Sequence, residues 1–244
     1  VQFPPHGPVA LVVISAPAPS GSGGLYSLSP VLAGGTVSGP RARLTEIEQR
    51  LSGVSTVVGI NGDFTAGSDL HPAGVVIADG AFLRGFSPGR TSAAVDAAGT
   101  LHVGRIAFAG TWRGSGQRRP LDGVNQALRG NQTMLYTPAW GAQTPAVSGG
   151  VAIALEPFPV PAANTDLTAT VATVATPPVA IPVDGAVLVA GGTDAAKLQA
   201  EAQQGAEVTI RMILPAGWDD VRAAFGGGPL LVRHLHFRGV AGVG

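Results

Sequence analysis

The stretch Val57-Val58-Gly59-Ile60-Asn61-Gly62-Asp63-Phe64 changes character halfway along. Its apolar half predicts the end of a strand over 54–60, because a short β-branched run bounded by turn residues is typical of a buried strand. Asn-Gly-Asp ends that strand, and a loop rich in Gly, Asp, His and Pro follows. Functional residues are often carried on loops that a rigid scaffold positions. Asn61 and Asp63 are therefore the first candidates for a functional site.

The segments on either side predict a sheet with few helices. Asp79-Gly80 lies between apolar runs, which is the strongest short-range signal for a hairpin. Because strands and helices do not alternate, we expect an α+β fold with a mixed, mostly antiparallel sheet, in one domain over 1–244. Further expected elements are hairpins turning at 97–99 and 184–185, helices over 41–51 and 195–204, an exposed loop over 110–119 and a helical turn over 218–225.

Composition excludes several classes of protein. The net charge is zero and only 12% of the 244 residues are charged, whereas a nucleic-acid binder would show a basic face. There is no cysteine, so disulfides and thiolate metal sites are excluded. No apolar run approaches the length of a membrane helix. Lys197 is the one Lys among 15 basic residues, which reflects either genome composition or Arg side chains that bind oxyanions.

Common catalytic motifs are missing from the sequence. It contains no G-x-S-x-G elbow, no P-loop, no G-x-G-x-x-G after a strand and no H-E-x-x-H. His234 and His236 have the spacing of one strand face, but no third metal ligand is visible. Serine hydrolases, P-loop enzymes, dinucleotide binders and zincins therefore lose support.

Four segments, in this order, resemble the phosphodiester glycosidase family. The first is Gly59-Ile60-Asn61-Gly62-Asp63-Phe64, followed by Pro72-x-Gly74-Val75-Val76 and the turn at Asp79-Gly80. The second is Val124-Asn125 with Leu135-Tyr136-Thr137-Pro138-Ala139-Trp140-Gly141. The third is Ile181-Pro182-x-Asp184-Gly185-x-Val187-Leu188-Val189, and the fourth is Gly226-Gly227-Gly228-Pro229-Leu230-Leu231-Val232.

The resemblance implies an α+β fold and a hydrolase that cleaves a sugar-1-phosphodiester, in a cell-wall or exported glycan, at its glycosidic side. Thr65 departs from the family, which usually has a second aromatic after Phe64. The family also continues past Gly-Gly-Gly-Pro into a part that this sequence does not match. We therefore expect the chain to correspond to the amino-terminal part of the family's domain, and its partners to be a glycan and that carboxy-terminal segment.

Glycosidases commonly divide acid and base catalysis between carboxylates, so Asp63 is the first candidate for that role. Its alternative is an Asp that caps a turn. Asn61 either binds a sugar hydroxyl or supplies a left-handed turn residue. Hydrolysis needs no organic cofactor. A divalent cation is an open alternative, and spacing does not identify its ligands.

Further candidates for substrate binding each have a structural alternative. Gly227 and Gly228, with Gly226, form either an anion-binding nest or a tight turn. Arg90 binds the phosphate or lies on the surface. Trp140 stacks on a sugar or packs in the core. Gly62, His71 and Asp69 either line the same pocket or belong to a solvated loop.

Two other functions remain open from sequence: a carbohydrate-binding or wall-binding module without catalysis, and an inactive fragment of the same fold. Because the sequence starts without Met and lacks cysteine, and because members of the family are exported, we expect a secreted or cell-wall-associated bacterial protein. A trimmed chain would begin in the same way.

Overall fold

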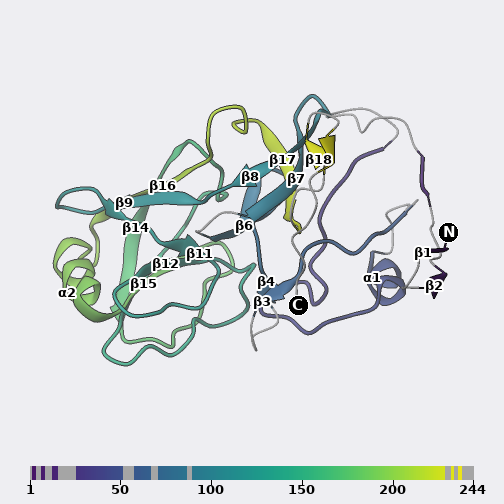
Figure 1. Cartoon of the computed structure of the whole chain (residues 1–244). Coiled ribbons are helices and arrows are strands. Elements are labelled where there is room, and N and C mark those ends of the chain that lie inside the picture. The colour runs from purple at the N-terminus through teal and green to yellow at the C-terminus, as the bar shows by residue number, and fades with distance from the viewer. Residues whose placement is uncertain are drawn as a thin grey trace.

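The computed structural model of the chain describes residues 2–3, 7–8, 13–15, 26–51, 58–66, 71–86, 90–228, 232–233 and 236–237. Its main feature is a sheet of 13 strands in the order β10-β9-β16-β14-β13-β15-β12-β11-β6-β5-β17-β7-β8. Two helices lie at opposite ends of the molecule in Figure 1, α2 beside the strands β9 to β16 and α1 beyond the strands β3 and β4. The fold is α+β with a mixed, mostly antiparallel sheet, as predicted.

The helices are α1 (Leu44–Arg50) and α2 (Gly192–Glu201). The strands of the large sheet are β5 (Val76–Ala78), β6 (Ala81–Phe86), β7 (Arg90–Asp96), β8 (Leu101–Ile106), β9 (Ala109–Arg113), β10 (Arg119–Pro120), β11 (Gly123–Val124), β12 (Thr133–Tyr136), β13 (Val151–Leu155), β14 (Asp166–Ala175), β15 (Ala186–Ala190), β16 (Glu207–Ile213) and β17 (Val221–Gly226). Three separate pairs are β1 (Gln2–Phe3) with β2 (Gly7–Pro8), β3 (Thr65–Ala66) with β4 (His71–Pro72), and β18 (Val232–Arg233) with β19 (His236–Phe237).

The sheet buries apolar side chains on both of its faces. Successive side chains of a strand point to opposite faces, so Leu188 of β15 joins one cluster while Val187 and Val189 join another. The larger cluster, here called the main core, includes Trp112, Phe82, Ile153, Ile210 and Leu198. The smaller one, here called the second-face cluster, includes Val37, Met134, Tyr136, Trp140 and Ile181. Burial on both faces explains why β15 reads as a continuous apolar run.

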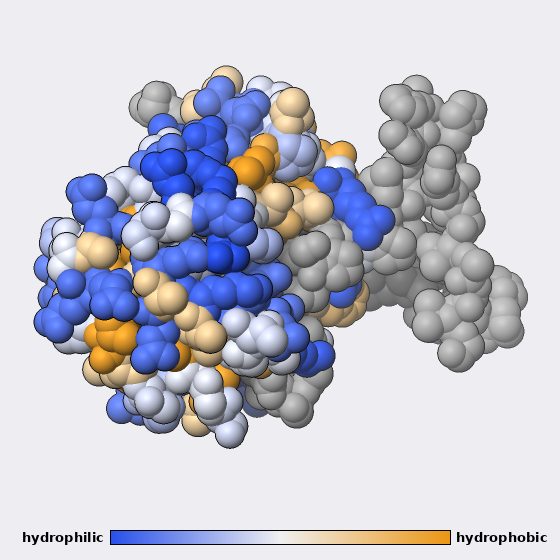
Figure 2. Space-filling view, turned by 90° about the vertical axis from the view of Figure 1, so that its left-hand side faces the viewer, coloured by the Kyte–Doolittle hydropathy of each residue, from blue (hydrophilic) through white to orange (hydrophobic). Residues whose placement is uncertain are grey.

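Helix α2 covers the main core with one side only. Ala195 and Leu198 are buried, whereas most other side chains of the helix point outward. Figure 2 shows that this end of the molecule presents a largely hydrophilic surface with small hydrophobic patches. The helix begins three residues before the predicted start, because its N-cap is Gly191. Within the described part of the chain, no helix is long and apolar enough to cross a membrane.

The strand predicted over 54–60 is not formed where the structure describes it. Residues 58–60 are irregular, and the side chains of Val58 and Ile60 are 49% and 63% exposed. A strand needs a hydrogen-bonded neighbour, and no described strand pairs with this run. The prediction of a buried strand is therefore wrong for residues 58–60, because no described segment pairs with this apolar run or buries it. Residues 52–57 lie outside the described residues.

Three other predictions are corrected. The expected loop over 110–119 contains β9, which pairs with β16, and Trp112 points into the main core. The expected helical turn over 218–225 contains β17, which pairs with both β5 and β7. The hairpin at Asp184-Gly185 has only its second arm, β15, because Pro182 lacks the N–H that a first arm would donate. Polar or short alternating runs such as these give too weak a periodicity to identify a strand.

The two other predicted hairpins are confirmed. β5 and β6 pair across Asp79 and Gly80, whose φ angles are 50° and 79°. Two consecutive left-handed residues form the turn that matches the twist of a two-stranded hairpin, and Asp-Gly is a preferred pair for it. β7 and β8 pair over six residues and turn at 97–99.

The turn between β7 and β8 is held by the carboxylate of Asp96. Its Oδ1 accepts the N–H groups of Ala98 and Thr100, at 2.9 and 2.8 Å, and its Oδ2 lies 2.8 Å from Nε2 of His102. The hydrogen bond to His102 and those to the backbone lower the pKa of Asp96 to about 2. Because the carboxylate is favoured in the folded state, this contribution to stability is complete above pH 4 and is lost as the pH falls towards 2.

Replacement of Asp96 by Asn is therefore expected to lower the melting temperature at pH 7 and to have a shrinking effect between pH 4 and pH 2. Thermal unfolding of both proteins across this pH range checks the prediction. Asp220→Asn is the control, since Asp220 is exposed and contributes only its backbone carbonyl to the turn, through Ala97. A difference between Asp96→Asn and the parent that is constant from pH 7 to pH 2 would contradict it.

Candidate functional site

A β-bulge in β6 turns a charged side chain away from the main core. Ile77 of β5 faces Phe82 of β6, whereas the preceding residue of β5, Val76, faces Arg84. Leu83 therefore has no partner in β5 and is the extra residue of the bulge. Phe82 packs against Phe108 in the main core, and a Cβ on Gly85 would lie 2.4 Å from the same Phe108 ring. Arg84 therefore points to the other face of the sheet.

Arg84 is 5% exposed, and its hydrogen bonding is incomplete. Nη1 donates to the backbone oxygen of Asn125 at 3.0 Å, whereas Nε has no partner among the described residues. Burial lowers the pKa of Arg84 to about 10, and the negative charge of nearby Asp63 only partly offsets this effect. The ion pairs of the described residues do not include Arg84. A buried cation without a paired anion is costly, so its retention calls for an explanation.

Asn125 connects β6 to the segment that follows β12. Its side-chain amide donates to the oxygen of Leu83 and to Oγ1 of Thr137, both at 2.8 Å. Its Oδ1 accepts the N–H of Thr137 at 2.9 Å. Asn125 is completely buried and has φ 50°, a left-handed conformation that Asn tolerates better than most residues. The amide therefore fixes both the bulge that carries Arg84 and the start of the 137–141 turn.

Asp63 joins three segments of the chain. It has φ 57°, Oδ1 accepts the N–H of Phe64 and Oδ2 accepts the N–H of Gly74, both at 2.7 Å. A Cβ on Gly226 would lie 2.6 to 2.8 Å from the carboxylate, so only glycine fits there. The side chain is half-buried, and each carboxylate oxygen keeps a second lone pair. Asp63 is thus an anchored carboxylate that can accept one more hydrogen bond on each oxygen.

Arg90 and the glycine segment lie beside Phe64, the neighbour of Asp63. The guanidinium of Arg90 sits 5.7 Å from the centre of the Phe64 ring, and its Nη2 donates to the oxygen of Gly227 at 3.3 Å. The N–H of Gly227 donates to the oxygen of Thr91 at 2.8 Å, so it continues the pairing of β17 with β7. A Cβ on Gly228 would touch the Phe64 ring at 3.6 Å.

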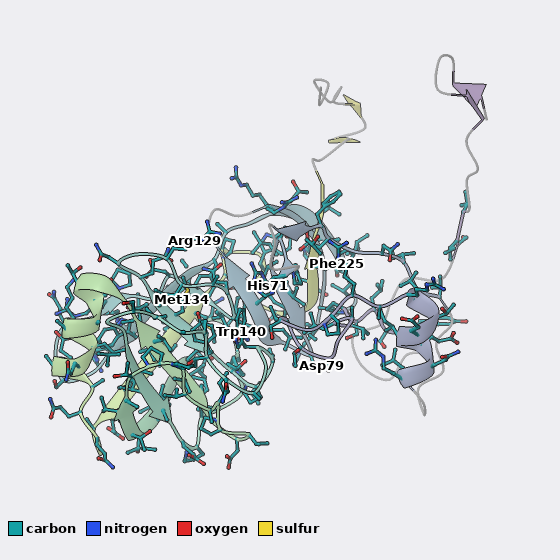
Figure 3. The ribbon with its side chains drawn as sticks, turned by 90° about the horizontal axis from the view of Figure 1, so that it is seen from below. His71, Asp79, Arg129, Met134, Trp140 and Phe225 are labelled. Carbon is teal, nitrogen blue, oxygen red and sulfur yellow. The ribbon has the colours of Figure 1, made fainter. Side chains whose placement is uncertain are left out.

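His71 packs against Trp140, which belongs to the turn at 137–141. Their ring centres are 4.9 Å apart, and Trp140 also packs against Tyr136 at 5.2 Å. Each is 8% exposed, and Nδ1 of His71 lies 3.1 Å from the oxygen of Val37. Figure 3 shows the two side by side near the middle of the molecule. In this arrangement Trp140 serves packing, which is the alternative to sugar stacking that the sequence leaves open.

The remaining predicted residues are placed as follows. Asn61 is exposed, and Gly62 lies against the ring of Phe225, which a Cβ would approach to 2.8 Å. Asp69 lies outside the described residues, as does His234. Two groups are therefore formed: Asp63, Phe64, Arg90 and the glycines 226–228 in one, and His71 with Trp140 in the other. Arg84 is influenced by the charge of Asp63, and Asn125 is hydrogen-bonded to Thr137, at the start of the turn that contains Trp140.

Arg84 was not among the residues that the sequence predicted for the site, and Asn125 and Thr137 were noted only as parts of a motif. A charged residue within the apolar run 81–86 could have indicated a break in alternation, but the bulge that explains it depends on the pairing with β5. Within the described residues, no group of three or more His, Asp and Glu side chains is arranged to hold a metal ion.

A shallow groove adjoins this polar network. It has a cavity volume of about 230 Å³, and two of its lining residues, Leu83 and Thr137, accept hydrogen bonds from Asn125. The other lining residues are mostly apolar: Phe82, Pro138, Ala139, Phe158, Pro159, Val160, Pro161, Val183, Asp184 and Gly185. The groove therefore shares a wall with the buried amide.

Comparison with known proteins supports the fold alone. No protein-family model matches the chain, and no curated protein matches it either. The chain is similar to the crystal structure of a hypothetical protein from Synechocystis, with a TM-score of 0.71 and 22% identity over 88% of this chain. It is also similar to a structure named "Putative exported protein" from Burkholderia pseudomallei K96243, with a TM-score of 0.51 and 19% identity over 69% of this chain. The chain spans 39% and 40% of the lengths of these two proteins.

Proposed function

We propose that the chain binds a sugar-1-phosphodiester and hydrolyses it at the glycosidic side. The observation that supports this proposal is the convergence of the segments that resemble the phosphodiester glycosidase family. Asp63 and Gly74 of the first segment contact Gly226 of the fourth. Asn125 and Thr137 of the second are linked to them through Arg84, and β15 of the third pairs with β12. Segments far apart in the sequence therefore share one region of the fold.

The chemistry of this region fits a glycosyl phosphodiester. Asp63 would accept a proton or a hydroxyl hydrogen bond through the free lone pairs of its carboxylate. Asn61, exposed on the same loop, would bind a sugar hydroxyl. Arg90 would contribute positive charge near the phosphate through the guanidinium that rests on Phe64. The reaction requires no organic cofactor.

Binding without hydrolysis is the second candidate function. Glycoside hydrolysis commonly uses two carboxyl groups on either side of the scissile bond. Among the described residues, the site defined above contains one carboxylate, Asp63, and the backbone already holds both of its oxygens. A carbohydrate-binding module derived from the same fold would need no second carboxylate.

Asp63→Asn is expected to reduce release of free sugar from a glycosyl phosphodiester by about 10²- to 10⁴-fold, the usual range for loss of an acid or base group. Asn tolerates the left-handed φ of Asp63, so the backbone can be kept. The measurement is sugar release from a panel of glycosyl phosphodiesters that includes UDP-N-acetylglucosamine, with folding checked by circular dichroism.

Asp79→Asn is the matched control for this experiment. Asp79 also has a left-handed φ, of 50°, but it is exposed at the turn between β5 and β6. Equal turnover by the parent and by Asp63→Asn would exclude Asp63 from catalysis. Absence of turnover in both, with sugar-phosphate binding retained, would select the binding module.

We also propose that the protein is exported. Support comes from the name of the Burkholderia neighbour and from the family resemblance. Fractionation of cells that express the complete gene tests this, and recovery of the protein only from the cytoplasm would contradict it.

A further inference from the structure

We propose that Arg84 is the phosphate-binding residue of this site, and that the edge of its guanidinium bearing Nε–H takes an oxyanion of the phosphodiester. The inference depends on the proposed function only for the source of that oxyanion. It rests on three features of Arg84: its burial, its unpaired nitrogen and the direction in which Asn125 holds it.

Burial makes the charge of Arg84 unusual in this chain. It is the one charged residue among the buried polar side chains of the described residues. The other arginines with described side-chain partners are half-buried or exposed, as in the pairs of Arg119 with Glu201 and Arg211 with Asp166. A bound oxyanion would supply the missing partner, and Arg suits it because its planar fork matches the geometry of phosphate.

The orientation of the guanidinium favours a ligand on one edge. Nη1 donates to the backbone oxygen of Asn125, which fixes the plane of the group at one corner. Nε–H and the adjacent Nη2–H form the side edge that binds carboxylate or phosphate with two parallel hydrogen bonds. Nε has no partner among the described residues, so its N–H is a buried, unsatisfied hydrogen-bond donor.

Asp63 lies near Arg84 without neutralising it. Its charge acts on Arg84, yet the two groups form no ion pair within 4.0 Å in the described structure, because Phe64 and Gly74 hold both carboxylate oxygens. A phosphate on Arg84 would therefore not have to displace the carboxylate. This arrangement keeps an acceptor for the sugar and a donor for the phosphate in the same region.

Arg90 is less suited to the same task. Its guanidinium is half-buried, donates to Gly227 and rests on the Phe64 ring. It can add positive charge to the region, but its guanidinium already has these two interactions in the absence of a ligand. Arg84 alone combines burial above nine-tenths with an unpaired donor among the described arginines.

The test is the effect of inorganic phosphate on thermal unfolding, with sodium chloride at equal ionic strength as the reference. Phosphate is expected to raise the melting temperature of the parent in a saturable manner, as a ligand of the folded state does. Arg84→Met is expected to lose the saturable rise. Arg84→Lys keeps the charge but lacks the Nε–H edge, and should bind phosphate at least tenfold more weakly.

Arg129→Met is the matched control, because Arg129 is exposed, whereas Arg84 is buried; Figure 3 shows Arg129 apart from Phe225, the neighbour of Gly226. Phosphate also stabilises proteins by exclusion from their surface, but that effect is shared by all variants. If Arg84→Met does not fold, the phosphate affinity of Arg84→Lys is compared with that of the parent instead. A parent without a saturable response, or an Arg84→Lys protein with the parent's phosphate affinity, would overturn the proposal.

The phosphate experiment is separable from the sugar-release experiment. Phosphate binding that depends on Arg84 without any sugar release would support the anion site and contradict hydrolysis. Sugar release that continues in Arg84→Lys with unchanged KM and unchanged phosphate affinity would support hydrolysis and contradict the role of Arg84.

Discussion

Asn125→Ala is expected to lower the free energy of unfolding by about 3 to 5 kcal/mol, because each buried polar group that loses its partner costs about 1 to 3 kcal/mol. The substitution removes three side-chain hydrogen bonds and leaves the oxygen of Leu83 and the N–H of Thr137 without a partner. It also places Ala at φ 50°, which costs roughly 1 kcal/mol more than Asn at such a position. Urea unfolding at neutral pH measures the change.

Two variants separate the causes of this loss. Asn125→Gly removes the same hydrogen bonds but accepts the left-handed φ, so it should be more stable than Asn125→Ala. Asn164→Ala is the matched control, since Asn164 has φ 57° and bonds Leu214 and Asp219 but is only half-buried. Its cost is expected to be smaller, about 1 to 2 kcal/mol. Equal losses for Asn125→Ala and Asn164→Ala would show that burial of the network contributes nothing.

Gly226→Ala is expected to destabilise the protein by about 1 to 3 kcal/mol, as overpacking of a filled site does. The new methyl group would lie 2.6 to 2.8 Å from the carboxylate of Asp63, and the Cα of Gly226 already lies against Gly74. Asp63 must then move and lose its hydrogen bond with Gly74, so ligand binding should weaken together with stability. Urea unfolding and the sugar-release assay measure the two effects.

Gly227→Ala provides the control within the same segment. A Cβ at Gly227 would meet only the oxygen of Thr91, at 3.6 Å, which is an ordinary van der Waals contact. Its stability should therefore stay within about 0.5 kcal/mol of the parent, as for a substitution without a steric cost. If Gly226→Ala behaves like Gly227→Ala, the contact between Gly226 and Asp63 does not constrain the site.

The parts of the fold that the sequence predicted are those with strong local signals. Asp79-Gly80 specifies its turn through two left-handed residues. β9 was not predicted because Trp112 is the only large apolar residue in the whole strand, Ala109–Arg113, which therefore shows no alternation. Residues 58–60 were misassigned because apolar periodicity does not reveal whether a neighbouring strand exists.

The candidate site was predicted in part for a similar reason. Asp63 and the glycines 226–228 could be proposed from the sequence because they belong to motifs with a local form. Arg84 was missed because its direction is set by a bulge against β5, and Asn125 acquires its role only when Thr137 is brought to it. Pairings between distant segments are not encoded in any short window of sequence.

The order of strands in the large sheet also bears on how the chain folds. β17 lies between β5 and β7, and β9 pairs with β16. Strands from early in the sequence therefore pair with strands that come much later in it. Such a topology has a high contact order. The chain loses conformational entropy when it closes the long loops, and the strand pairings offset that loss only once they have formed. During synthesis, β5 to β8 emerge long before β17. The carboxylate of Asp63 and the Gly226 that confines it can therefore meet only after nearly all of the sheet's strands have been translated.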